Sequence, residues 1–156
     1  MRGVNQINIS INQLADFSNG TDGKKRGIIR QQQNPNPLKV FWYQLAKARI
    51  RKSIAAKGDL EPILRGISEL KNKNLSKKRQ IDDRTVSLEA MQKFIELRIP
   101  QVLQNLDYEV VKKSKVKSIY INGVEVIVSP DLIVKAEIDG KMHYGAVKIH
   151  VAKHNQ

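Results

Sequence analysis

The sequence has no cysteine, no long apolar run and few acidic residues. Without cysteine, the chain can form no disulfide bond, thiolate zinc site or cysteine nucleophile, which fits a reducing compartment. Apolar runs such as Ile127-Val128 are far too short to cross a bilayer. The residues that follow Met1-Arg2-Gly3-Val4 are polar, so we expect no signal peptide and no export. Together these absences predict a cytoplasmic protein that is not inserted in a membrane.

The shortage of acid leaves a strongly basic chain. Aspartate and glutamate number 15 against 28 lysines and arginines, which gives a formal net charge of +13. Such an excess favours a polyanionic partner, DNA or RNA, because phosphates attract clustered cations. The alternative is a well-solvated basic protein with no such partner. With 156 residues and 40% hydrophobic residues, we expect a single globular domain over residues 1–156.

Hydrophobic periodicity divides the chain near residue 106. Residues 1–105 are predicted to be mainly helical, because apolar side chains recur there at three- and four-residue spacing. Ser10 is a plausible cap of the first helix, and either Thr21 or Asp22 can cap the second. The polar stretch 71–83 is predicted to be an exposed loop. The predicted helices cover residues 9–17, 24–33, 38–56, 60–70 and 85–99.

From Tyr108 the period of the pattern becomes two, which indicates β-strands. Asn122-Gly123 is the strongest hairpin signal of the chain, and Asp139-Gly140-Lys141 forms a second turn. Residues 106–156 are therefore predicted to form an antiparallel β-meander of about four strands. The predicted fold class is α+β, with N-terminal helices followed by the meander.

The hairpin over residues 129–150 brings an acid and a lysine close together. If its turn centres on Gly140, Asp131 lies opposite about Ile149, one residue from Lys148. A carboxylate and an ammonium group on adjacent strands suit phosphodiester chemistry, in which a carboxylate holds a divalent cation and the lysine offsets developing charge. The alternative is a strand-end aspartate and a surface lysine without chemistry. A slip of one residue in the strand register would turn the side chains of Asp131 and Lys148 to opposite faces of the sheet.

The segment that runs from Pro130-Asp131 through one strand and a tight turn to Val147-Lys148 resembles the motif of the PD-(D/E)xK nucleases. The resemblance covers residues 85–152 and implies a core of order αβββαβ with Mg²⁺-dependent nuclease activity. Asp131 would be the metal-binding and catalytic acid, and Lys148 the catalytic lysine. Ala146 stands where that family has a second acid. Helical Glu89 or Glu96 would then complete the metal site.

A wider resemblance is to a family of uncharacterised bacterial proteins. It rests on Ile11-Asn12-Gln13-Leu14, on the run Gln31-Gln32-Gln33-Asn34-Pro35 and on the closing Gly145-Ala146-Val147-Lys148-Ile149-His150. Alanine is typical of that family at the position of Ala146. This wider resemblance indicates fold more than activity, whereas the nuclease resemblance suggests a role in bacterial defence or mobile-element biology.

Basic helices provide a second candidate site. Their cations would contact phosphates, which positions a protein on nucleic acid without specifying sequence; the alternative is a solvated helix face. Phe41, Trp42 and Tyr43 are expected in the core rather than in base stacking, and His150 with His154 is not expected to bind zinc. The predicted nucleic-acid-binding residues are Lys24, Lys25, Arg26, Arg30, Arg49, Arg51 and Lys52.

Three hypotheses follow for function. The first is a nucleic-acid-binding, metal-dependent nuclease. The second is a binding module that keeps the sheet and the basic surface but has lost the chemistry, as Ala146 suggests. The third is a protein-interaction subunit, in which an open sheet edge pairs with a partner strand or with a second copy of the chain.

Overall fold

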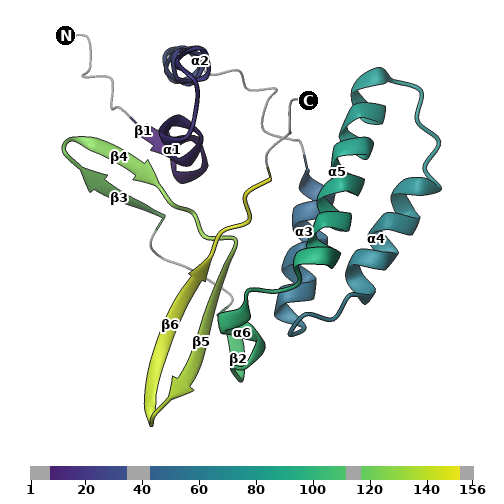
Figure 1. Ribbon diagram of the computed structural model, residues 1–156, viewed down its shortest axis with the longest axis vertical. Helices are drawn as coiled ribbons and strands as arrows, with labels where there is room; N and C mark the ends of the chain where they lie inside the picture. Colours follow the sequence, from purple (N-terminus) through teal and green to yellow (C-terminus); the bar gives the residue numbers. More distant parts are fainter. Residues whose placement is uncertain (1–7, 35–42, 112–116, 152–156) are drawn as a thin grey trace. The chain divides into compact units, whose positions relative to one another are not determined.

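The structure is a computed structural model that describes residues 8–34, 43–111 and 117–151, and it confirms the α+β class (Figure 1). Helices dominate the first two thirds of the chain and strands the last third. The elements are β1 (Asn8–Ser10), α1 (Ile11–Ser18), α2 (Asp22–Gln33), α3 (Gln44–Ala55), α4 (Glu61–Lys71), α5 (Lys78–Leu97), α6 (Gln101–Gln104), β2 (Tyr108–Val111), β3 (Ser118–Ile121), β4 (Val124–Ile127), β5 (Leu132–Ile138) and β6 (Lys141–Val147).

The chain forms two compact units, each built from two separate stretches of sequence. We call Met1–Lys39 with Lys113–Pro130 the small unit, and Val40–Lys112 with Asp131–Gln156 the large unit. Each unit contains one three-stranded sheet, of order β1-β4-β3 in the small unit and β2-β5-β6 in the large one. The strands therefore do not follow one another in the single meander expected from the sequence. Alternation of apolar and polar residues indicates a strand, but it does not show which other strand pairs with it.

The small unit starts with a reciprocal cap. Ser10 Oγ accepts a hydrogen bond from the Gln13 backbone N–H at 3.2 Å, and Gln13 Oε1 accepts one from the Ser10 N–H at 3.2 Å. This capping box satisfies two amides at the start of α1. Gln32 Nε2 of α2 also donates to Gln13 Oε1 at 2.9 Å and joins the two helices. The predicted caps Ser10 and Thr21 are both confirmed.

The large unit is organised by three helices that lie side by side, α3, α4 and α5 (Figure 1). Gly66 of α4 allows close packing, since a Cβ there would lie 2.8 Å from Arg49 Cγ and 3.1 Å from Met91 Sδ. Tyr108 of β2 is buried, and its hydroxyl donates to the Ile54 carbonyl of α3. The core consists of Ala46, Ile50, Ile54, Ile63, Leu70, Met91, Ile99, Leu103, Tyr108, Val134, Ala136 and Ile149.

Two helix starts differ from the prediction by six residues or more, and residues 9 and 10, predicted to be helical, belong to β1. The helix expected over 38–56 begins at Gln44, because Tyr43 has φ 65° and cannot continue a right-handed helix; residues 38–42 lie outside the described part. Helix α5 begins at Lys78, inside the stretch 71–83 that was predicted to be a loop. Lysine, arginine and glutamine are good helix formers, so this turn is helical without an apolar stripe.

Candidate functional site

The β5–β6 hairpin turns over two residues. Asp139 and Gly140 have φ 51° and 73°, the conformation of a type I′ turn, and Ile138 pairs with Lys141. The register ends with Leu132 against Val147, and neither Asp131 nor Lys148 belongs to the paired strands. The sequence count had placed Asp131 opposite Ile149, because it assumed a turn centred on Gly140.

Asp131 precedes Leu132 and Lys148 follows Val147, and their side chains approach each other at this end of the hairpin. Lys148 Nζ is 3.9 Å from Asp131 Oδ2, and the side chains are 28% and 13% exposed. Ala146 pairs with Ile133, on the face of the sheet that also carries Lys135 and Tyr144. The hairpin thus brings Asp131 and Lys148 close together at its open end, with Ala146 two residues before Lys148.

The Asp131 carboxylate also has a structural contact. Its Oδ2 accepts a hydrogen bond from the Ile149 backbone N–H at 2.8 Å, and the Asp131 N–H donates to the Val147 carbonyl at 2.9 Å. These bonds hold the chain where it leaves β6, and Ile149 enters the core, 8% exposed. A role in folding is therefore sufficient to explain why this position is acidic.

A second ion pair lies on the face of the sheet that carries Ala146. Lys135 Nζ is 2.9 Å from Glu109 Oε2, and these residues are directly opposite in the β2–β5 register. The hydrogen bond to Glu109 raises the pKa of the Lys135 ammonium. Tyr144, opposite Lys135, is largely exposed. The face is thus charged and aromatic rather than a closed apolar layer.

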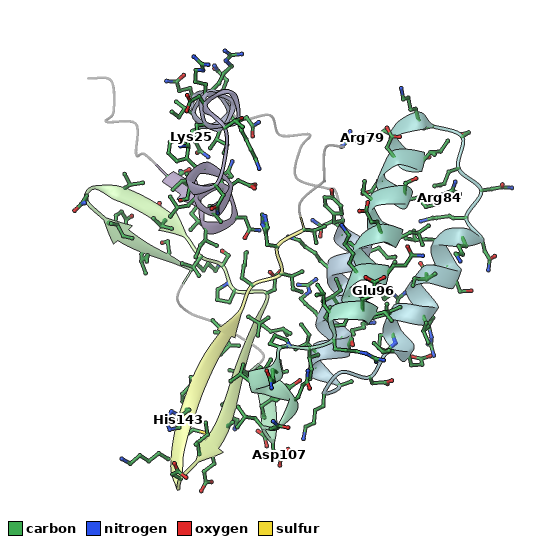
Figure 2. The ribbon with its side chains drawn as sticks, in the orientation of Figure 1. Lys25, Arg79, Arg84, Glu96, Asp107 and His143 are labelled. Carbon is green, nitrogen blue, oxygen red and sulfur yellow. The ribbon has the colours of Figure 1, made fainter. Side chains whose placement is uncertain are left out.

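The predicted metal ligands are distributed unevenly. Glu89 lines the same cavity as Lys148 and forms an ion pair with Lys93 at 3.0 Å. Glu96, labelled in Figure 2, is exposed on α5 and does not line that cavity. Within residues 8–34, 43–111 and 117–151, no three acidic, histidine or cysteine side chains come together to hold a metal ion.

The cavity that contains Lys148 and Glu89 lies within the large unit and has a volume of about 410 Å³. It is lined by α3, by α5 and by the segment that follows β6. Tyr43 also lines it, and burial first, then the charges of Glu89 and Asp83, raise the pKa of its phenol. The Tyr43 backbone N–H donates to Asp83 Oδ1 at 3.0 Å.

The predicted phosphate-binding cations fall on both units. On α2, Lys24 pairs with Asp16 at 2.9 Å and Lys25 lies 5.8 Å from the centre of the Phe17 ring, while Arg26 and Arg30 are exposed. On α3, Lys52 is exposed and Arg51 is half-buried. Arg49 pairs with Glu69 of α4 at 2.5 Å and packs against Gly66, so it has a structural role between the helices.

A further basic segment was missed as a site by the sequence analysis. Residues 71–79, which connect α4 to the first turn of α5, contain five cationic residues and no acidic one, and all five side chains are exposed. Figure 2 shows Arg79 at the start of α5 and Arg84 beside the connection, where Arg84 Nη1 donates to the Lys73 carbonyl. Local charge density was the signal that could have identified it. The five cationic residues of the segment 71–79 are Lys71, Lys73, Lys77, Lys78 and Arg79.

Among the residues that the structure describes, no helix is both long and apolar enough to cross a membrane. Comparison with known proteins adds no relative: no family model, no curated protein and no solved structure matches this chain. Function must therefore be argued from the surfaces and side chains described above.

Proposed function

We propose that this chain is a nucleic-acid-binding protein that holds the phosphate backbone with its basic helical surfaces. The observation that carries the proposal is the exposed segment 71–79, with five cations and no acid in a chain of net charge +13. Like charges crowded together destabilise a folded surface unless a polyanion neutralises them. Phosphates would do so, and released counterions would drive binding.

The start of α5 supports the same proposal. Lys77 occupies the N-cap and makes no side-chain cap hydrogen bond, and the first turn has no acidic residue. Positive charge at a helix N-terminus is unfavourable, because the helix dipole is positive there. Lys77 and Lys78 thus stand where they do not help the helix, but where they would meet a phosphate.

The binding test uses fluorescence anisotropy of labelled DNA and RNA oligonucleotides. We expect wild-type binding with Kd of about 10⁻⁴ to 10⁻⁶ M at physiological salt, typical of non-specific contacts. The double variant Lys77→Gln/Lys78→Gln should bind more weakly than Lys117→Gln/Lys141→Gln, which has the same net charge. Equal affinity of the two double variants would refute a role for the segment, and no binding by the wild type would refute the proposal.

Metal-dependent cleavage is a second candidate, favoured by the 3.9 Å separation of Asp131 and Lys148. Mg²⁺ is commonly held by one or two carboxylates together with substrate phosphates, so Asp131 and Glu89 are the residues of this chain that would take part. Because Ala146 stands in place of an acid, we propose nucleic-acid binding as the main function. Cleavage is a second activity that a separate experiment tests.

The cleavage test asks whether an acid at position 146 restores activity. Supercoiled plasmid is incubated with Mg²⁺ or Mn²⁺, with EDTA as the blank, and wild type is compared with Ala146→Glu. Ala146 lies two residues before Lys148, whereas exposed His143 points to the opposite face of β6 from Ala146, so His143→Glu is the matched control. Cutting by Ala146→Glu alone supports a degenerate nuclease centre, and cutting by wild type supports an active one. No cutting by any of them leaves a binding protein.

A further inference from the structure

The cavity of about 410 Å³ in the large unit is of the size used for small ligands, about 300–1,000 Å³. Its walls are mostly apolar and are contributed by three segments: Ile50 and Ile54 by α3, Phe94 by α5, and Val147 and Ile149 by the end of β6 and the segment that follows. A mostly apolar cavity with a few polar groups at defined points is typical of a binding site for an organic ligand.

The charged residues that line the cavity are mainly cationic. Lys93, Arg98 and Lys148 face one acid, Glu89, which pairs with Lys93 at 3.0 Å. The ligand that this lining favours is therefore apolar and flat in one part and anionic in another. A nucleotide of a single-stranded nucleic acid has both parts, because its flat base lies next to an anionic phosphate.

Two aromatic side chains lie in the lining, Phe94 and Tyr43. Tyr43 has φ 65°, a left-handed conformation that is uncommon for a bulky residue and costs free energy. Its backbone N–H is held by the Asp83 carboxylate at 3.0 Å. Aromatic rings beside cations are the usual platform for unstacked bases, and they tolerate every base because each has a flat face.

We propose that this cavity accepts one unstacked base of a single-stranded nucleic acid, with the adjoining phosphate beside Lys148. The inference rests on the proposed function, which it makes more specific: duplex regions would contact the basic helices, and a strand end or loop would enter the cavity. A base paired within a duplex could not enter, so single strands should bind more tightly than duplexes of the same length.

The test uses 2-aminopurine, a fluorescent base whose emission changes when it leaves or joins a stack. A single-stranded oligonucleotide that carries it is titrated with the full chain, and affinity is measured in parallel by anisotropy. Ala90→Phe fills the cavity, because half-buried Ala90 lines it, and exposed Ala55→Phe is the matched control on α3. Phe94→Leu keeps the wall apolar but removes the ring, and serves if Ala90→Phe fails to fold.

We expect the 2-aminopurine signal to change with wild type and Ala55→Phe but not with Ala90→Phe. Affinity for the single strand should fall by about fivefold or more in Ala90→Phe and Phe94→Leu, the loss typical of one base stack, while duplex affinity stays unchanged. The base site is refuted if both cavity variants bind single strands and alter the signal as wild type does. Absence of binding to every nucleic acid would instead refute the proposed function, and the base site with it.

Discussion

At the scale of single residues, Asp131 has a structural contact whether or not the chain has nuclease ancestry. Its carboxylate accepts the Ile149 N–H at 2.8 Å and lies 3.9 Å from Lys148 Nζ, with 13% of the side chain exposed. Hydrogen bonds to charged groups are worth more than neutral ones, and an amide left without its acceptor in a partly buried site costs free energy.

Asp131→Ala should lower the free energy of unfolding by about 1–3 kcal/mol, because the Ile149 amide loses its acceptor. Asp131→Asn keeps a carbonyl oxygen at this position and should lose less. Urea denaturation of the three proteins measures the difference. If Asp131→Ala were as stable as wild type, the hydrogen bond from the Ile149 N–H would not contribute to the stability of the fold.

Tyr108 should make the large unit sensitive to high pH. Burial raises the pKa of its phenol above 10.0, and the hydroxyl donates to the Ile54 carbonyl. A group whose pKa is higher in the folded state than in the unfolded one stabilises the fold below its unfolded pKa, and this contribution is lost as pH rises through the folded pKa.

Unfolding free energy should therefore decline once the pH passes 10.0, and Tyr108→Phe should decline less steeply. At neutral pH, Tyr108→Phe should be less stable by about 1 kcal/mol, since the Ile54 carbonyl loses one of its two donors and keeps the Lys57 N–H. Urea titrations at neutral pH and above pH 10.0 measure both effects. Equal alkaline slopes for the two proteins would contradict this role of Tyr108.

At the scale of elements, the sequence predicts most helices because their local signals are strong. The Ser10 cap, the Thr21 cap and the amphipathic stripe of α4 are read from neighbouring residues alone. The start of α3 was wrong because it depends on the left-handed Tyr43, whose backbone is held by Asp83 forty positions away. Such a tertiary contact leaves no periodic trace in the sequence.

Two helical glycines should respond oppositely to alanine. Gly66 is buried, and a Cβ there would lie 2.8 Å from Arg49 Cγ and 3.1 Å from buried Met91 Sδ, whereas a Cβ at Gly27 of α2 meets nothing within 4 Å. Gly66→Ala should destabilise the protein by about 1–3 kcal/mol through overpacking. Gly27→Ala should stabilise it by about 0.5–1 kcal/mol. Chemical denaturation of both variants tests the pair, and a stabilised Gly66→Ala would contradict the close α3–α4–α5 packing.

At the start of α5, we expect one substitution to raise the stability of the protein and to lower its affinity for nucleic acid. Lys77 has the extended conformation of an N-cap, φ −86° and ψ 129°, but no capping side chain. Lys77→Asp should stabilise the protein by about 1 kcal/mol by capping α5. The same change should weaken nucleic-acid binding, because it replaces a cation with an anion. Thermal unfolding and anisotropy of one preparation measure both, with Lys141→Asp as the control for charge alone. A variant that gains stability and keeps full affinity would show that Lys77 does not contact phosphate.

At the scale of the whole molecule, the sequence predicts charge and class but not topology. The excess of cations can be counted from the sequence, so its prediction does not depend on the fold. The two sheets depend on the pairing of β1 with β4, more than a hundred residues apart, and on β2 joining β5 instead of β3. Alternating patterns in β2 and β3 are equally compatible with either partner. The Asp131–Lys148 juxtaposition was predictable because a two-residue turn sets its register, although the count was one residue out.

The proposed function depends on charge, so the dependence of affinity on salt tests it most directly. The logarithm of the binding constant for a single-stranded oligonucleotide is measured against the logarithm of salt concentration, for wild type and for Lys77→Gln/Lys78→Gln. We predict a steep linear decrease for wild type, and a slope reduced by about 1 for each phosphate contact that the variant loses. An affinity that is independent of salt, or identical slopes for the two proteins, would contradict binding through the basic segment 71–79.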